Sequence, residues 1–387
     1  MAGSLPNPEY LIEALRLKAE LLGLELLGIT QPTTPPHVTT YETWVKQGRY
    51  AQMGYMATER NRYLRVHPEA IMAEAHALLV VGMRYPNPQA IPPPPSPYPL
   101  GRIASYAWGK DYHHIIPELI KELLKELEAW LSTPILARIY TDTGPILERD
   151  FAQKAGLGWI GKNTCLIHPR KGSYFLLGEA FVNASLPPTP PFATDHCGSC
   201  RRCIEACPTQ CILPDRTLDA GRCISYLTIE NKGPIPRDLR SSIGNWVFGC
   251  DICQMVCPWN VRFASSEGSP AFAMRPDIAF PNLIDELSLS PMDFKARYGN
   301  TPVMRARRRG YLRNIAVALG NSADPGSVPR LSLTLKNEPE PLIRAHAAWA
   351  LGRIKTRLAR KHLSEALQRE PDPDVQIEIK AALEDTD

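Results

Sequence analysis

The chain has 387 residues, of which 44% are hydrophobic and 22% are charged, and its formal net charge is +4. These are ordinary values for a folded soluble protein, and the length predicts two or three domains. The net charge is too small to prove a polyanionic partner. No uncharged apolar run is long enough to span a membrane, so we expect no membrane partner.

The N-terminal segment predicts an amphipathic helix. Leu11, Leu15 and Leu22 recur at helical spacing with charged residues between them. This pattern differs from the basic and then apolar order of a signal peptide. We therefore expect a cytoplasmic protein. Because thiols stay reduced there, the ten cysteines indicate metal binding or catalysis and not disulfides.

Residues 1–185 form the first predicted region, an α/β (α+β) domain. Apolar runs at 76–83 and 134–140 are typical of buried strands between amphipathic helices. The proline-rich segment 91–99 predicts a rigid surface loop, with a ligand for an SH3-type domain as the alternative. Residues 185–191 are interpreted as a linker to the next region.

The second region, residues 186–265, contains two cysteine motifs. The first has the spacing C-x2-C-x2-C-x3-C-P and the second has C-x2-C-x3-C-P; their cysteines are Cys197, Cys200, Cys203 and Cys207, and then Cys250, Cys253 and Cys257. This is the spacing of ferredoxins with two 4Fe-4S clusters, in which the fourth cysteine of a run binds the other cluster. The second motif has Val247 at its first position, so one ligand is missing, and Cys223 is the available substitute.

Eight cysteines can thus fill the eight ligand positions of two clusters. We assign cluster one to Cys197, Cys200, Cys203 and Cys257, and cluster two to Cys207, Cys223, Cys250 and Cys253. Two zinc sites are the alternative, since paired C-x2-C motifs also bind zinc. Cys165 and Cys211 are left over, and we interpret both as small buried residues.

The third region, residues 266–387, contains an internal repeat. Ala-Leu pairs begin at Ala318, Ala350 and Ala382, which are 32 residues apart. A period of this length, with small and apolar residues at helical spacing, predicts paired helices that stack into a short all-α solenoid similar to HEAT repeats. Such repeats usually build a binding surface and not an active site.

Five further segments, together with the cysteine motifs and the repeat, resemble the epoxyqueuosine reductase family. They are residues 109–116, 142–163, 172–179, 222–236 and 244–260. The resemblance implies three domains: a cobalamin-binding catalytic domain at 1–185, a ferredoxin-like domain with two 4Fe-4S clusters at 186–265, and a tRNA-binding HEAT-like domain at 266–387. It also implies an activity, the reduction of epoxyqueuosine to queuosine at the wobble position of tRNA, which is the last step of queuosine biosynthesis. By the same resemblance we expect a monomer that receives electrons from an external low-potential donor.

The resemblance also implies the site residues. Asp142 is expected to contact cobalamin and to donate a proton to the opened epoxide. The other residues expected near the corrin are Arg65, Lys162, Asn163, Ser225 and Asp251. The residues themselves leave alternatives open. Asp142 can cap a helix that starts at Pro145, Arg65 can be an exposed salt-bridging residue, and Ser225 and Asp251 can support the cysteine loops.

For tRNA, the resemblance favours a cationic stretch at the start of the tail. Arg305, Arg307, Arg308, Arg309 and Arg313 lie on the expected first repeat helix, and Lys232 lies in the loop between the cysteine motifs. A cationic helix face suits phosphate contacts. An ordinary solvated helix face is the alternative.

Two other functions fit part of the pattern. A reductive dehalogenase of a small molecule would share the cofactors but would need no arginine-rich repeat tail. A non-catalytic ferredoxin-type electron carrier would need only the cysteine region and would leave Asp142 without a role.

Overall fold

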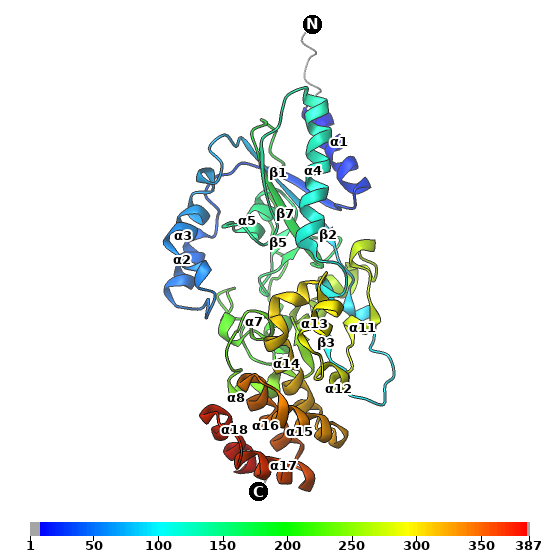
Figure 1. Cartoon of the computed structure of the whole chain (residues 1–387). Coiled ribbons are helices and arrows are strands. Elements are labelled where there is room, and N and C mark those ends of the chain that lie inside the picture. Colours follow the sequence, from blue (N-terminus) through cyan, green and yellow to red (C-terminus); the bar gives the residue numbers. More distant parts are fainter. Residues whose placement is uncertain (1–7, 385–387) are drawn as a thin grey trace.

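The structure is a computed structural model that describes residues 8–384. The molecule is elongated, with the sheet domain at one end, the helical tail at the other, and the cysteine region between them (Figure 1). None of the described helices is long and apolar enough to cross a membrane.

The first region is built on a four-stranded sheet. Its strand order is β1-β2-β7-β4, with every neighbouring pair antiparallel, and the strands are β1 (Leu26–Thr30), β2 (Ala77–Arg84), β7 (Phe175–Val182) and β4 (Ala137–Tyr140). The strand predicted at 76–83 is confirmed as the buried β2. The prediction of a buried strand at 134–140 is wrong in one respect. β4 lies at the edge of the sheet, where it has a neighbour on one side only, and none of its residues is buried.

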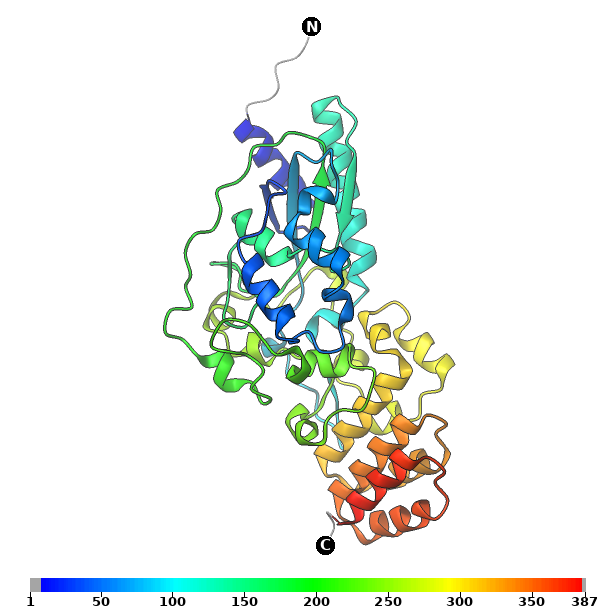
Figure 2. The same ribbon diagram turned by 90° about the vertical axis from the view of Figure 1, so that its left-hand side faces the viewer.

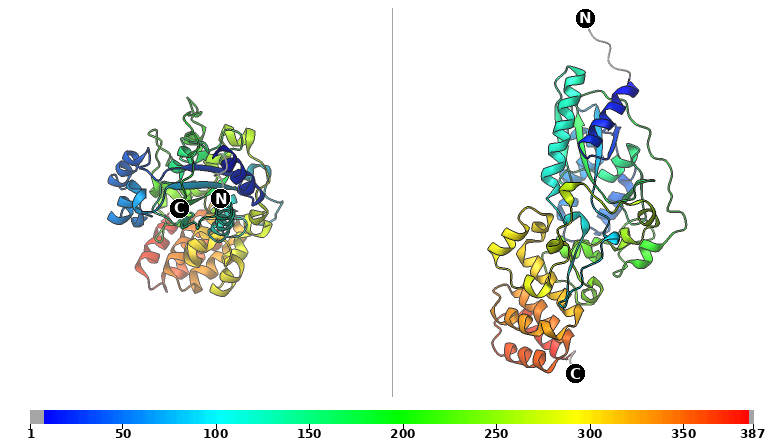
Figure 3. Two further views of the ribbon diagram at one scale, coloured as in Figure 1. Left: turned by 90° about the horizontal axis from the view of Figure 1, so that it is seen from above. Right: turned by 90° about the vertical axis from the view of Figure 1, so that its right-hand side faces the viewer.

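Helices cover both faces of this sheet. α1 (Pro8–Leu21) and α4 (Tyr112–Leu131) pack on the face that presents Leu79, whereas α5 (Glu148–Lys154) packs on the face that presents Leu78. This division follows from the strand period of two, by which neighbouring side chains point to opposite faces. Figure 3 shows α4 running along one face of the sheet.

The predicted N-terminal helix is confirmed as α1. Leu11 and Leu15 are buried against the sheet, whereas Leu22 lies just beyond the end of the helix.

Two helices form a lobe at the side of the sheet domain (Figures 1 and 2). They are α2 (Val38–Lys46) and α3 (Glu59–Val66), and α3 begins where the Thr58 side chain accepts a hydrogen bond from the Asn61 N–H. The indole Nε1 of Trp44 donates to the Leu218 carbonyl at 2.7 Å. This bond ties the lobe to the cysteine region.

The cysteine region contains short helices and one short strand. The helices are α6 (Arg202–Ala206), α7 (Ile224–Ile229), α8 (Arg237–Arg240), α9 (Ile252–Met255) and α10 (Pro258–Phe263). The strand β8 (Trp246–Phe248) pairs in parallel with β3 (Arg102–Ile103), which follows the proline-rich segment. As predicted, residues 91–99 form an irregular and mostly exposed loop. A small hairpin, β5 (Trp159–Ile160) and β6 (Leu166–Ile167), leads from the sheet domain toward the first cysteine motif.

The tail confirms the predicted helical repeat. Three short helices, α11 (Pro276–Ala279), α12 (Leu283–Glu286) and α13 (Pro291–Tyr298), precede α14 (Arg307–Ser322), α15 (Val328–Asn337), α16 (Pro341–Ile354), α17 (Arg357–Leu367) and α18 (Pro373–Glu384). The small residues explain the stacking. A Cβ on Gly320 would lie 2.9 Å from the Cα of Ala350, and a Cβ on Gly352 would lie 2.9 Å from the Cα of Ala382. The close approach of α14, α16 and α18 therefore requires glycine at both positions.

The second and third regions share one core. A continuous cluster of buried apolar residues runs from Trp108 and Phe248 through Tyr311 to Ile379. The border at residue 265 therefore crosses a common core, and the tail is fixed against the cysteine region.

Candidate functional site

Asp142 lies on the loop that follows the edge strand β4. Its backbone has a φ of 56°, a conformation that aspartate tolerates better than most residues, and its side chain is 68% exposed. Tyr112 donates a hydrogen bond to Asp142 Oδ2 at 2.9 Å, and the Asp142 N–H donates to Glu148 Oε1 at 2.7 Å. His113 Nε2 lies 3.9 Å from the same Oδ2. The loop thus presents an exposed carboxyl group whose position is set by α4 and by the start of α5.

The interpretation of Asp142 as a helix cap is wrong. α5 begins at Glu148, and Leu147 stands at its N-cap position. No helix starts at Pro145, because residues 141–146 form consecutive bends. The backbone of the loop is instead held by Glu148, whose carboxyl group accepts a hydrogen bond from the Asp142 N–H.

Tyr106 connects Asp142 to the second cysteine motif. Its ring packs edge-on against Tyr112, with 6.1 Å between the ring centroids. Burial, followed by the charges of Asp142 and Asp251, raises the pKa of Tyr106 well above its ordinary value. Asp251 is buried beside Cys250, and its Oδ2 accepts the Ser105 N–H at 2.7 Å. Asp142 and the second motif therefore flank the same tyrosine.

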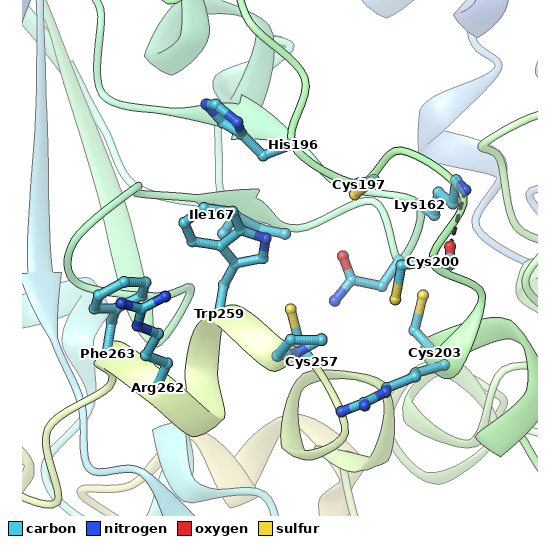
Figure 4. A pocket seen from close by; sticks show the side chains of 13 residues that line it. Lys162, Ile167, His196, Cys197, Cys200, Cys203, Cys257, Trp259, Arg262 and Phe263 are labelled. Atoms are coloured by element: carbon cyan, nitrogen blue, oxygen red, sulfur yellow. Dashed lines mark hydrogen bonds between the residues drawn. The ribbon is translucent and has the colours of Figure 1, made fainter.

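The first predicted set of thiols surrounds one cavity. Cys197, Cys200, Cys203 and Cys257 all line a space of about 260 Å³ (Figure 4). Trp259 forms part of its wall and packs edge-on against Trp159, with 4.9 Å between the ring centroids. Three cationic residues, Lys162, Arg202 and Arg262, also line the space. Four thiolates around an iron–sulfur core leave net negative charge, so cations at this place suit a cluster.

Lys162 and Asn163 hold the cysteine loops. Lys162 Nζ donates to the carbonyls of Gly198 and Cys200 at 2.6 and 2.8 Å. Asn163 is buried, and its Nδ2 donates to the Cys253 carbonyl at 3.5 Å. The structure thus directs Lys162 to the first thiol set, and it places Asn163 between the two sets.

The second predicted set, Cys207, Cys223, Cys250 and Cys253, also gathers in one place. Burial and the charges of Cys223 and Cys207 raise the pKa of Cys250 well above its ordinary value. The hydrogen bond with Cys165, burial and the charges of Cys165, Cys250 and Cys223 likewise raise the pKa of Cys253. Thiols close enough to influence one another in this way can bind one cluster. Ser225, two residues past Cys223, is half-buried on α7.

The two leftover cysteines lie beside this second set. Cys211 is buried as predicted, but its Sγ lies 3.4 Å from the Sγ of Cys207. Cys165 is half-buried, and its thiol is hydrogen-bonded to that of Cys253. The interpretation of Cys165 and Cys211 as ordinary buried residues therefore overlooked that both thiols lie beside the second set. The position of Cys211, only four residues after Cys207, was the available signal for one of them.

No group of three or more His, Cys, Asp or Glu side chains within residues 8–384 is arranged to hold a single metal ion. The fit to clusters rests on two observations: four thiols line one cavity, and four more influence one another beside it.

Arg65 is buried in the lobe. It is only 4% exposed, it donates to the Asn61 carbonyl at 3.3 Å, and it stacks on the Tyr41 ring at 5.6 Å. The alternative of an exposed salt-bridging arginine is therefore wrong. Burial and the charges of Glu230 and Asp142 raise the pKa of Tyr55, on the same lobe, whereas the charge of Arg305 opposes this rise. The lobe therefore faces the Asp142 loop and the start of the tail.

The cationic residues predicted for tRNA separate into two groups. Lys232, Arg305, Arg307 and Arg309 are exposed, and we call these four residues the cationic rim. Arg305 is 60% exposed and forms an ion pair with Glu230 at 2.8 Å. The charge of Asp142 acts on Arg305, so the rim borders the Asp142 loop.

The other two arginines are internal. The prediction that Arg313 contacts tRNA is wrong, because its side chain is wholly buried and donates to the carbonyls of Leu227, Asn231 and Gly233. Arg308 is partly buried and forms a bidentate ion pair with Glu338. Arg313 thus attaches the tail to the cysteine region, and Arg308 holds α14 within the tail, so neither side chain is free to join a phosphate-binding surface.

Sequence reasoning missed Glu148 and Glu179 and gave Tyr112 and His113 no firm role. Tyr112 and His113 were visible only as part of the segment 109–116. Glu179 occupies the middle of a buried strand, and an acidic residue in an apolar run was the available signal.

Comparison with protein families gives three matches. The family of epoxyqueuosine reductase QueG, DUF1730, matches residues 65–143; the 4Fe-4S double cluster binding domain matches residues 196–260; and HEAT repeats match residues 304–384. The cysteine region is therefore an iron–sulfur double-cluster domain, and the tail belongs to the HEAT-like repeats.

Similar proteins cover nearly the whole chain. The epoxyqueuosine reductase of Xanthomonas campestris is 38% identical over 350 residues, which is 89% of this chain and 97% of that protein. The enzyme of Pseudomonas aeruginosa is 38% identical over 355 residues, 90% of this chain and 96% of that protein. The Escherichia coli enzyme is 35% identical over 331 residues, 85% of this chain and 86% of that protein.

Solved structures agree with these relatives. A crystal structure of epoxyqueuosine reductase with an epoxyqueuosine-modified stem loop of tyrosine tRNA superposes with a TM-score of 0.87 at 30% identity, over 98% of this chain and 100% of that one. The Bacillus subtilis enzyme, in a structure with its catalytic aspartate loop swung out of the active site, gives a TM-score of 0.88 at 30% identity with the same coverage. The electron-carrier and dehalogenase alternatives are not retained. The chain belongs to the epoxyqueuosine reductase family and is an oxidoreductase.

Proposed function

We propose that this chain reduces the epoxide of epoxyqueuosine to give queuosine at the wobble position of tRNA, with cobalamin and two 4Fe-4S clusters as cofactors. The observation that carries the proposal is the position of Asp142. Its exposed carboxyl group borders the cationic rim on one side and shares Tyr106 with the second cysteine motif on the other. An acid, a nucleic-acid surface and an electron-carrying region thus meet at one place.

The clusters would be held by the two thiol sets. Cys197, Cys200, Cys203 and Cys257 fit the first, because they line one cavity with three cationic residues around it. Cys207, Cys223, Cys250 and Cys253 fit the second. Such clusters supply single electrons at low potential.

We expect cobalamin to bind between the lobe, the Asp142 loop and the second thiol set. Two buried polar atoms on this side of the molecule have no hydrogen-bond partner among the described residues: Arg65 Nε and Ser105 Oγ. Buried polar groups without partners are costly, so a polar ligand that reaches them is expected to bind. The corrin, when bound, would supply the electrons that open the epoxide. Ser225 and Asp251 would lie near the corrin because each is close in the chain to a cysteine of the second set, Cys223 and Cys250.

The chain's own residues would supply the proton, orient the acid and bind the tRNA. Asp142 would protonate the oxygen of the opening epoxide, since it is the exposed carboxyl group on the loop. Tyr112 fixes the carboxyl orientation through its hydrogen bond to Oδ2. The cationic rim would bind tRNA phosphates and so deliver the modified base to Asp142.

An anaerobic assay tests the proposal. The chain would be loaded with iron, sulfide and cobalamin, desalted, and mixed with tRNA that contains epoxyqueuosine and with a chemical reductant. We expect queuosine in the nucleoside digest by mass spectrometry, and a corrin spectrum that stays with the protein through desalting. Reactions without reductant or without cobalamin are the controls. Absence of queuosine from the fully loaded reaction would contradict the proposal.

A further inference from the structure

A carboxyl group is wholly buried in the sheet domain. Glu179 is the fifth residue of β7, opposite Tyr140 of β4, and its side chain is 0% exposed. Neither of its carboxyl oxygens has a hydrogen-bond partner among the described residues. An ionised carboxylate in such a place would be strongly disfavoured, and the usual outcome is that the group stays protonated. Burial and the charges of Glu148 and Asp142 raise the pKa of Glu179 well above its ordinary value.

Glu148 connects this buried acid to the Asp142 loop. It is the first residue of α5 and half-buried, and its Oε1 accepts the Asp142 N–H at 2.7 Å. Loss of solvent and the charge of Asp142 raise the pKa of Glu148 to about 7. Both members of the pair are therefore shifted toward the protonated form, Glu179 more strongly than Glu148.

The proposed reaction needs more protons than Asp142 carries. Conversion of the epoxide to the alkene of the product breaks two C–O bonds and forms a C=C bond, and the oxygen leaves as water. The reaction consumes two electrons and two protons. The electrons come from the external low-potential donor, which is oxidised. One carboxyl group supplies one proton and must then be protonated again before it can supply another.

We propose that Glu148 and Glu179 form a carboxyl pair that stores the second proton of the reaction and positions the Asp142 loop. The inference rests on the proposed function and deepens it. The pair is close to Asp142 because β7 neighbours β4 in the sheet and α5 follows the loop. Glu148 is a positioning residue through its bond to the Asp142 N–H, and Glu179 is the buried reserve behind it.

Other titratable groups around the pair are less suited to this role. Tyr112 on α4 and Arg149 on α5 interact with Glu148, and Tyr140 on β4 lies opposite Glu179. His113 on α4 and Arg305 at the start of the tail interact with Asp142. Burial and the Asp142 charge raise the pKa of Tyr112 far above neutrality, so it does not ionise. His113 Nδ1 is already bound to Asp111 at 2.7 Å.

Two isosteric variants test the pair. In Glu148→Gln, the amide oxygen can still accept the Asp142 N–H, so the loop keeps its position but the side chain no longer carries a proton. In Glu179→Gln, a neutral amide replaces a neutral acid in the same volume. We expect each variant to retain iron, cobalamin and KM for tRNA, to lose kcat by about a hundredfold, and to lose the pH dependence of kcat near neutrality. Glu118→Gln, an exposed glutamate of α4, is the matched control.

Infrared difference spectroscopy provides a readout that does not depend on turnover. In the wild type, pH titration should show the C=O stretch of a buried protonated carboxyl group that is lost in Glu179→Gln. A second such stretch should disappear with a midpoint near 7 and be absent from Glu148→Gln.

The outcomes separate this inference from the proposed function. Normal kcat and an unchanged pH profile in both variants, with an active wild type, would overturn the proton store and leave the proposed function intact. An inactive wild type would overturn both, although the infrared titration would still measure the pair. If Glu148→Gln fails to fold, Glu179→Gln alone decides between the outcomes.

Discussion

The two thiol sets are built from nearly the same motif, yet they occupy different surroundings. The first set lines a cavity with Lys162, Arg202 and Arg262 around it. The second set has two surplus thiols beside it and adjoins Asp251, which shares Tyr106 with Asp142. The difference indicates a division of labour. A cluster in the open, cationic surroundings suits exchange of electrons with a partner, and one near Asp142 suits delivery to the substrate.

Loss of a ligand from either set is expected to have the largest effect. Reconstituted wild-type protein should hold about eight irons. Cys203→Ala should prevent binding of the first cluster, and Cys223→Ala should prevent binding of the second. Each variant should then hold about four irons and have no measurable turnover. Iron analysis and electron paramagnetic resonance measure the loss. The alanine variant of Cys165 should keep both clusters and is the control.

Cys211 sharpens this comparison because only the second set has a spare thiol next to Cys207. Full iron content in both Cys223→Ala and the double variant Cys223→Ala/Cys211→Ala would contradict the assignment of Cys223. Full iron content in Cys223→Ala that is lost in the double variant would show that Cys211 replaces the missing ligand.

Asp142→Asn is expected to have the next largest effect. The side chain keeps its shape and can still accept the Tyr112 hydrogen bond, but it cannot deliver a proton. Turnover should fall by at least about a hundredfold, with iron and cobalamin content unchanged. Near-normal turnover, with electron delivery to the corrin confirmed by its spectrum, would show that the proton comes from elsewhere. Thr143→Ala, on the same exposed loop, is the control.

A smaller effect is expected from the cationic rim. Replacing Arg305, Arg307 and Arg309 by Ala should weaken tRNA binding and flatten its salt dependence, because fewer counterions are released. The slope of log K against log salt should fall by about two to three. Arg353, Arg357 and Arg369, also exposed but further along the tail, give a control with the same change in charge. An equal salt slope in both triple variants would mean that the rim is an ordinary solvated surface.

The smallest effect is expected from Lys162→Met, which removes two hydrogen bonds to the first cysteine loop. Each such bond is worth about 1 kcal/mol, so the protein should fold and bind tRNA normally. The first cluster should be released to a chelator faster than in the wild type, whereas the second should be unaffected. Equal release from both sets would contradict the assignment of Lys162 to the first.

The sequence by itself determined the features that depend on local spacing. The cysteine runs, the apolar run of β2, the 32-residue repeat and the amphipathic α1 are all patterns of neighbouring residues, and each could be predicted. The resemblance to a family supplied Asp142 and the substrate, which spacing could not supply.

Only the tertiary structure decided which side chains face solvent and which groups share one environment. Arg307 and Arg313 lie on the same helix, but Arg307 is exposed, whereas Arg313 is buried beneath the end of α7 and the residues that follow it, 227–233. The local sequence at Asp142 is compatible with a helix cap, but in the folded chain the Glu148 side chain accepts the Asp142 N–H and no helix starts there. Glu179 lies 31 residues from Glu148 in the chain, and the two are brought together by the order of strands in the sheet. Burial and charge act through space, so proton affinity at this site follows from packing between distant segments.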